Sequence, residues 1–187
     1  MRFFAAAYPT EVAGVVLLDA QSPHARPALP GGQSVQGPIS TLAGVLRALA
    51  RVGVARLVTS VGSSDLPSEV AVRRHAAEST PQGVAGFADE FARLDDILDA
   101  ASGLPDLGNR PLVVVTAAAE ALDGWLAQQD RLATLSTNVS YRVFPDLTHD
   151  SLVESANGAT AASDAIRAVV TSVRSGTRLD GSTASQG

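Results

Sequence analysis

The chain has 187 residues, of which 45% are hydrophobic and 18% charged, enough for one domain with a buried core. Its formal net charge of -5, without a basic run, argues against nucleic acid or an anionic membrane as the main partner. The absence of cysteine excludes disulfides and thiolate metal sites. Because Pro9 and Glu11 interrupt the apolar start too early for a signal peptide, and no apolar run is long enough to span a bilayer, we expect a cytoplasmic protein.

The first part of the chain is predicted to form a helix, a strand and a loop. Residues Met1 to Tyr8 are apolar and rich in alanine, which predicts a helix that Pro9 ends. Residues Val15 to Leu18 form a continuous aliphatic run that is typical of a strand covered on both faces. The glycines and prolines between Ala25 and Gly37 predict a loop.

The middle of the chain is predicted to be helical. Apolar residues at helical spacing predict a helix from Thr41 to Val52, and a weaker helix follows Pro67. A clearer apolar stripe runs from Val84 to Leu98, with acidic residues mostly on the other side. We interpret this acidic side as a face exposed to solvent.

The last part of the chain alternates strands and helices. Leu112 to Thr116 and Ser140 to Phe144 are predicted strands, separated by a helix that Asp123 can cap. A final helix is predicted to begin near a capping Thr160, and the polar tail from Ser175 to Gly187 is expected to be disordered. This alternation indicates an α/β protein with about three parallel strands and flanking helices.

Two chemically active side chains follow predicted strands. Asp19 comes directly after the first strand, and His149 comes a few residues after the last. The catalytic and ligand-binding residues of open α/β sheets lie at the carboxyl ends of the strands. An acid that precedes a histidine in the chain also fits the serine, acid, histidine order of one class of catalytic triad. Asp19 and His149 are therefore the candidate catalytic residues.

These segments resemble the α/β-hydrolase family. Residues 8–20 look like the end of the helix after the nucleophile and the strand that follows it, residues 110–117 look like the next core strand, and the loop of His149 looks like the family's histidine loop. Residues of about 21–109 would then be the helical cap insertion, within a single domain over residues 1–174. The resemblance implies a serine-type hydrolase for an ester, amide or related small-molecule acyl substrate, with His149 as the base, Asp19 as the acid, and neither cofactor nor metal.

The sequence departs from this family at the nucleophile. Members carry the motif G-x-S-x-G, which is absent from the 187 residues. The nearest imitation, Gly32 to Gly37, has one residue too many and follows no predicted strand. We therefore expect a carboxyl-terminal part of the fold, truncated before Met1 and inactive by itself. The alternative is a hydrolase-like module without activity that needs a partner chain to complete its sheet.

The identity of the acid stays open between three residues. Most aspartates after a strand only bond to the next turn, and Glu120 and Asp123 follow the second predicted strand, where many α/β hydrolases carry their acid. We prefer Asp19, because Asp123 is well suited to cap a helix. The other histidines, His24 and His75, fall in the cap region and are interpreted as non-catalytic. Trp125 is interpreted as a packing residue.

Overall fold

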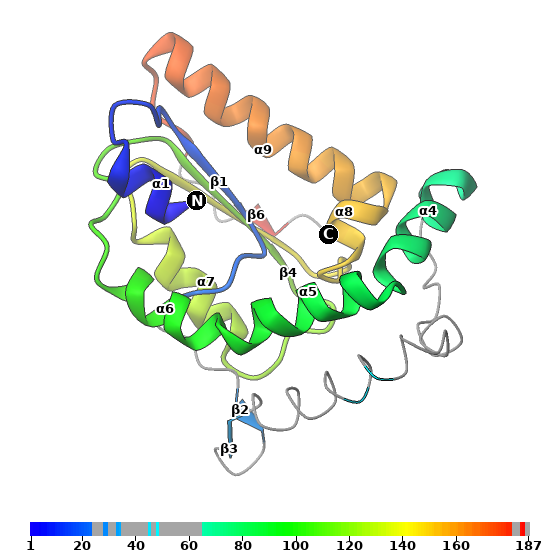
Figure 1. The fold of residues 1–187 in the computed structure, drawn as a ribbon. Helices are drawn as coiled ribbons and strands as arrows, with labels where there is room; N and C mark the ends of the chain where they lie inside the picture. Colours follow the sequence, from blue (N-terminus) through cyan, green and yellow to red (C-terminus); the bar gives the residue numbers. More distant parts are fainter. Residues whose placement is uncertain are drawn as a thin grey trace. The chain divides into compact units, whose positions relative to one another are not determined.

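The computed structural model separates into two compact units. One unit consists of Met1–Ala25 and Ala100–Gly187, and the other of Arg26–Asp99. The first unit contains the parallel sheet (Figure 1). Asp19 and His149 both belong to this unit. The residues that the structure describes are 1–23, 28–29, 33–34, 45, 48, 65–180 and 184–185.

A parallel sheet forms the centre of the first unit. Its strands lie in the order β1 (Val15–Leu18), β4 (Leu112–Ala117), β5 (Val139–Phe144) and β6 (Ala184–Ser185), and every neighbouring pair is parallel. The parallel α/β sheet predicted from the sequence is thereby confirmed for the three longer strands. The two-residue β6 was not predicted, because two residues carry no periodic signal.

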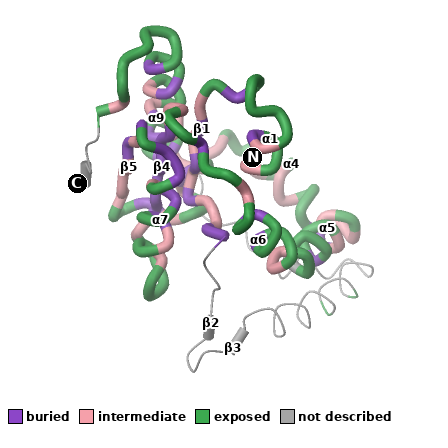
Figure 2. Tube along the Cα trace, turned by 90° about the vertical axis from the view of Figure 1, so that its left-hand side faces the viewer, coloured by how far each residue is buried: buried purple, intermediate pink, exposed green. Residues whose placement is uncertain are grey.

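Helices cover both faces of this sheet, which explains why its strands are apolar without interruption. Val15, Leu17 and Val114 pack in one cluster with residues of α1 (Arg2–Ala7) and α7 (Trp125–Ala133). Val113 and Val115 point the other way and pack in a second cluster with α9 (Ala156–Ser175). Successive side chains of a strand point to opposite faces, so a strand between two helical layers must be apolar throughout. Figure 2 shows buried residues along β4, β1 and the facing part of α9.

Two helices of the first unit begin differently from the prediction. The last long helix starts at Ala156, where Ser155 Oγ accepts from Gly158 N at 3.0 Å. Thr160, the predicted cap, instead lies inside the helix and donates to Ala156 O. Helix α7 starts at Trp125 after Gly124 in a left-handed conformation, and no side chain caps it, so Asp123 is not a helix cap. Serine and threonine are both good caps, so the sequence could not decide between positions five residues apart.

The described part of the second unit is mostly helical. It contains α4 (Ser68–Glu78), α5 (Pro81–Ala92) and most of α6 (Leu94–Ser102). The single helix predicted over Val84 to Leu98 is therefore two helices. Arg93 N donates to Glu90 O three residues back, which tightens the chain between them.

Residues 24–64, part of the region expected to be a cap, are described only in small part. In the predicted loop, β2 (Ala28–Leu29) and β3 (Gln33–Ser34) form an antiparallel pair. The predicted helix from Thr41 to Val52 lies outside the described residues except for positions 45 and 48. Among the described helices, none has both the length and the apolar character required to cross a membrane.

The carboxyl-terminal tail, expected to be disordered, is held against the sheet in its described part. Leu179 N donates to Asn138 Oδ1 at 2.8 Å, and the Leu179 side chain packs against the cluster under α9. Further on, Ala184 and Ser185 pair with β5 as β6. Composition predicted disorder because the tail is polar, whereas its described contacts come from the Leu179 side chain, from the Arg178 guanidinium, which donates to Thr137 O, and from backbone groups.

The corner between α8 (Ser151–Glu154) and α9 requires glycine at position 158. A Cβ atom there would lie 2.1 Å from Ser151 O and 2.6 Å from Leu152 Cα, both backbone atoms. We expect Gly158→Ala to lower the free energy of unfolding by about 1–3 kcal/mol, because the two helices must separate. Urea unfolding followed by circular dichroism measures this. Gly86→Ala in α5, where a Cβ meets no atom within 4 Å, is the control and should not destabilise the protein. Equal stability of Gly158→Ala and wild type would contradict this close packing.

Candidate active site

Asp19 ends β1 in an unusual backbone conformation. Its φ is 43°, the only positive value among the described residues that are not glycine. Its N–H still donates to Val115 O at 2.7 Å, so Asp19 completes the ladder between β1 and β4 before the chain turns away. A left-handed residue costs roughly 1–2 kcal/mol, less for aspartate and asparagine than for most others. Strain of this kind is a recurrent feature of functional sites.

The Asp19 carboxylate is buried and surrounded by hydrogen-bond donors. The residue is 5% exposed. Its Oδ1 accepts from Ala117 N at 3.0 Å and from Trp125 Nε1 at 3.1 Å. A buried charge is tolerated in a protein only when such donors replace water. With Oδ1 occupied twice, Oδ2 is left for a third partner.

That third partner is His149. Its Nδ1 lies 2.8 Å from Asp19 Oδ2, although the two residues are 130 positions apart in the chain. The His149 side chain is 73% exposed, in contrast to the aspartate beneath it. Its second ring nitrogen, Nε2, has no hydrogen-bond partner within the described part of the chain. Asp19 therefore orients the imidazole through Nδ1, while Nε2 on the other side of the ring is free to exchange a proton.

The loop that carries His149 is fixed on both sides of the histidine. Ala119 N donates to the carbonyl of Leu147, whose side chain is buried. On the other side, Thr148 N donates to Ser151 Oγ at 2.7 Å, and Ser151 N donates to Thr148 Oγ1 at 3.1 Å. These two reciprocal bonds span His149 and Asp150. The exposed imidazole thus projects from a backbone with little freedom to move.

A second set of buried polar contacts holds the chain directly after Asp19. Gln129 of α7 is fully buried, and its Nε2 donates to Ala20 O at 2.8 Å. Its Oε1 accepts from Thr116 Oγ1 at 3.3 Å. Because Gln129 lies one helical turn after Trp125, α7 contacts the end of β1 through two side chains on the same face.

The other residues considered from the sequence do not join this pair. Glu120 and Asp123 are exposed, and neither bonds to His149 in the described part of the structure. His75 lies in the last turn of α4 in the other unit, and His24 lies outside the described residues. Of the three acids left open by the sequence, the structure brings Asp19 to the histidine.

Trp125 and Gln129 are site residues that the sequence analysis missed. Trp125 was interpreted as packing, yet its indole N–H is bonded to the Asp19 carboxylate. No spacing or motif signals this contact, because the two residues are 106 positions apart. Thr148 and Ser151 did carry a weak signal, since a hydroxyl residue at each end of a four-residue turn is typical of side-chain to backbone bonding.

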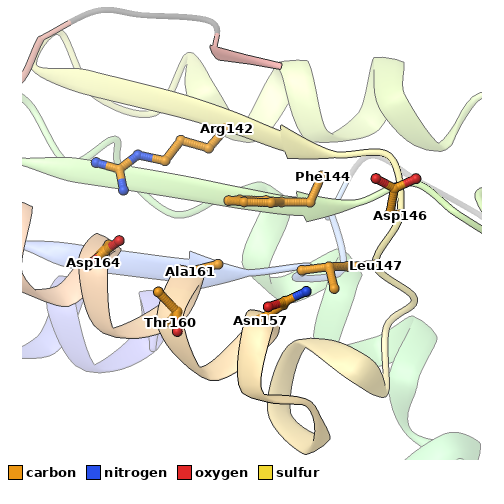
Figure 3. A pocket seen from close by; sticks show the side chains of 8 residues that line it. All are labelled: Arg142, Phe144, Asp146, Leu147, Asn157, Thr160, Ala161 and Asp164. Carbon is orange, nitrogen blue, oxygen red and sulfur yellow. The ribbon is translucent and has the colours of Figure 1, made fainter. Parts of the chain in front are cut away.

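Two further features bear on the surroundings of the pair, namely acidic or histidine clusters and hollows. Among the described residues, no group of three or more histidine, cysteine, aspartate or glutamate side chains could hold a metal ion. A hollow of about 300 Å³ lies between β5 and α9 (Figure 3). The residues that line it are Arg142, Phe144, Asp146, Leu147, Asn157, Thr160, Ala161 and Asp164. Since neither Asp19 nor His149 lines it, this hollow is separate from the pair.

Comparison with known proteins does not assign the chain to a family. No family model, no curated protein and no solved structure matches it.

Tyr141 on β5 lies near this site, and its surroundings raise the pKa of its phenol. Burial raises its pKa above the ordinary value of 10.0, and the negative charges of Asp130 and Asp19 act in the same direction. The Thr116 hydroxyl acts in the opposite direction and offsets only part of the effect. The phenol is thus kept neutral next to the buried carboxylate, since a phenolate there would be poorly solvated.

We expect Tyr141 to make stability fall at high pH. The pKa of Tyr141 is higher in the folded state than in the unfolded state. Its contribution to the free energy of unfolding is therefore intact below about pH 10, and it is lost as pH rises through the folded-state pKa. Urea unfolding at several alkaline pH values measures this loss, which should be smaller in Tyr141→Phe than in wild type. Tyr8→Phe, at an exposed position, is the matched control and should keep the wild-type profile. Identical profiles for wild type and Tyr141→Phe would contradict the raised pKa.

Proposed function

We propose that this chain is the carboxyl-terminal part of a serine-type α/β hydrolase that acts on an ester, amide or related acyl substrate. The observation that carries the proposal is the contact between Asp19 Oδ2 and His149 Nδ1 at the carboxyl edge of a parallel sheet. His149 is the general base, and Asp19 orients its ring. The nucleophilic serine belongs to a G-x-S-x-G turn outside these 187 residues.

The proposed chemistry uses the two ring nitrogens of His149 for different tasks. Nε2 accepts the proton of the serine hydroxyl as the oxygen attacks the acyl carbon, because a hydroxyl is a weak nucleophile until a base removes its proton. Nδ1–H donates to Asp19, whose negative charge stabilises the imidazolium that forms. Nε2 then returns the proton to the leaving group. The exposure of His149 and the burial of Asp19 suit these roles, since only the base has to reach the substrate.

The edge of the sheet supports a nucleophile strand next to β1. In the described part of the structure β1 pairs with β4 alone, so one of its edges is open. At the start of β1, residues 11–14 line a mostly apolar hollow of about 490 Å³, to which α1 and α9 contribute Phe4, Val169 and Val173. Exposed backbone edges and apolar patches are typical of surfaces that another segment covers. The same features favour the alternative, a module without activity whose sheet a partner chain completes.

By itself the chain is expected to have no serine-hydrolase activity. The proposal assigns the nucleophile and the oxyanion donors to another segment, and an acid with a base cannot form an acyl-enzyme alone. Incubation with a fluorophosphonate probe and with a p-nitrophenyl ester measures this. Stoichiometric labelling of any serine in this chain would overturn the assignment of the nucleophile to another segment.

In a longer protein that adds the coding sequence read in frame upstream of Met1, we expect a G-x-S-x-G motif and esterase activity. There, His149→Ala should lower kcat by several orders of magnitude without unfolding the protein. Asp19→Asn should lower kcat on the order of ten-thousandfold, and asparagine tolerates the positive φ, so backbone strain does not confuse the result.

Glu120→Gln and Asp123→Asn are the matched controls and should keep most of the activity. If Asp123→Asn lost most of its kcat while Asp19→Asn kept most of it, the catalytic acid would be Asp123, in the loop after β4, and not Asp19. An upstream sequence without the motif, combined with a partner protein bound at β1, would favour the module without activity.

A further inference from the structure

The indole of Trp125 occupies one oxygen of the candidate acid and leaves the other to the histidine. Trp125 Nε1 donates to Asp19 Oδ1 at 3.1 Å, and Ala117 N donates to the same oxygen at 3.0 Å. A carboxylate on a rotatable side chain can present either oxygen to a partner. Two donors on Oδ1, one from β4 and one from α7, select a single orientation in which Oδ2 meets His149 Nδ1.

We propose that Trp125 is a positioning residue that fixes the Asp19 carboxylate and, through it, sets His149 in the tautomer with its proton on Nδ1. The catalytic meaning of this role rests on the proposed function, but the contact itself does not. Nδ1–H donation to Asp19 leaves Nε2 unprotonated, which is the form that a general base requires.

The start of helix α7 sets where the indole lies. Trp125 is the first residue of the helix, and its backbone N–H donates to Leu122 O after the left-handed Gly124. One turn later, Nε2 of the buried Gln129 donates to Ala20 O, next to Asp19. The helix is therefore bonded to the chain after β1 one turn beyond the tryptophan contact. A tryptophan that served only for packing would not require its N–H to meet a buried carboxylate.

Nitrogen-15 NMR of the histidine ring tests the proposal, because the shifts of Nδ1 and Nε2 report which of them carries the proton in the neutral ring. In the wild-type chain we expect His149 to be mainly the Nδ1–H form. Trp125→Phe keeps an aromatic ring but removes the donor, and the major tautomer should change to Nε2–H, the form that a neutral histidine prefers in water. Asp19→Asn, which removes the charge of the acceptor, should produce the same change. Leu126→Ala, at the exposed neighbouring position of α7, is the control and should leave the tautomer unchanged.

The indole signal supplies a second measurement that does not depend on a tryptophan variant that folds. Trp125 is the only tryptophan of the chain, so the indole N–H gives a single NMR signal. Asp19→Gly removes the acceptor and suits the positive φ, and it should move that signal upfield. An unchanged indole signal would overturn the contact.

The outcomes separate this proposal from the proposed function. A wild-type ring in the Nδ1–H form that stays so in Trp125→Phe would overturn the role of Trp125 and leave the Asp19 and His149 pair intact. A wild-type ring in the Nε2–H form would overturn the pair itself. A change of tautomer in Trp125→Phe, with the tautomer of Leu126→Ala unchanged, would support both the role of Trp125 and the contact between Asp19 and His149.

Discussion

The arrangement of the first unit depends on how the buried carboxylate of Asp19 is satisfied. Removing a charged group from water is costly unless fixed donors replace the water. Here the donors come from three places in the chain, namely the end of β4, the start of α7 and the loop after β5. Each of these segments must lie where it does for the charge to be tolerated. One side chain thus links the strand that precedes it to three elements that are distant in sequence.

The donors around Asp19 also make the two residues of the pair differ in exposure. Asp19 is enclosed by backbone and indole donors, whereas the His149 ring projects into solvent from a loop fixed by Thr148 and Ser151. An acid that only orients and stabilises gains from burial, because a hydrogen bond to a charged group is stronger where water is excluded. A base has to reach its substrate. The division between a buried acid and an exposed base is the main reason to propose catalysis rather than a structural ion pair.

Helices cover both faces of the sheet that supports this site, but one of its edges is uncovered in the described part of the chain. Its faces are packed by α7 and α1 on one side and by α9 on the other, while the outer edge of β1 has no partner in the described part of the chain. The site lies at the end of this edge strand. A segment that paired with β1 would end close to Asp19, because strands that run in parallel bring their carboxyl ends to the same edge. The open edge of β1 and the pair of Asp19 and His149 therefore lie next to each other on the sheet.

The strands and the polar side chains at their ends could be predicted from the amino-acid sequence. The runs Val15 to Leu18 and Leu112 to Thr116 predicted buried parallel strands, because cover on both faces demands uninterrupted apolar residues. The positions of Asp19 and His149 after strands made them candidates. Three features required the folded chain: Asp19 meets His149, Trp125 bonds to Asp19, and Ser155 rather than Thr160 caps α9. The pattern of apolar residues predicts which side chains of an element are buried. A hydrogen bond between residues 106 or 130 positions apart depends instead on how the elements pack against each other.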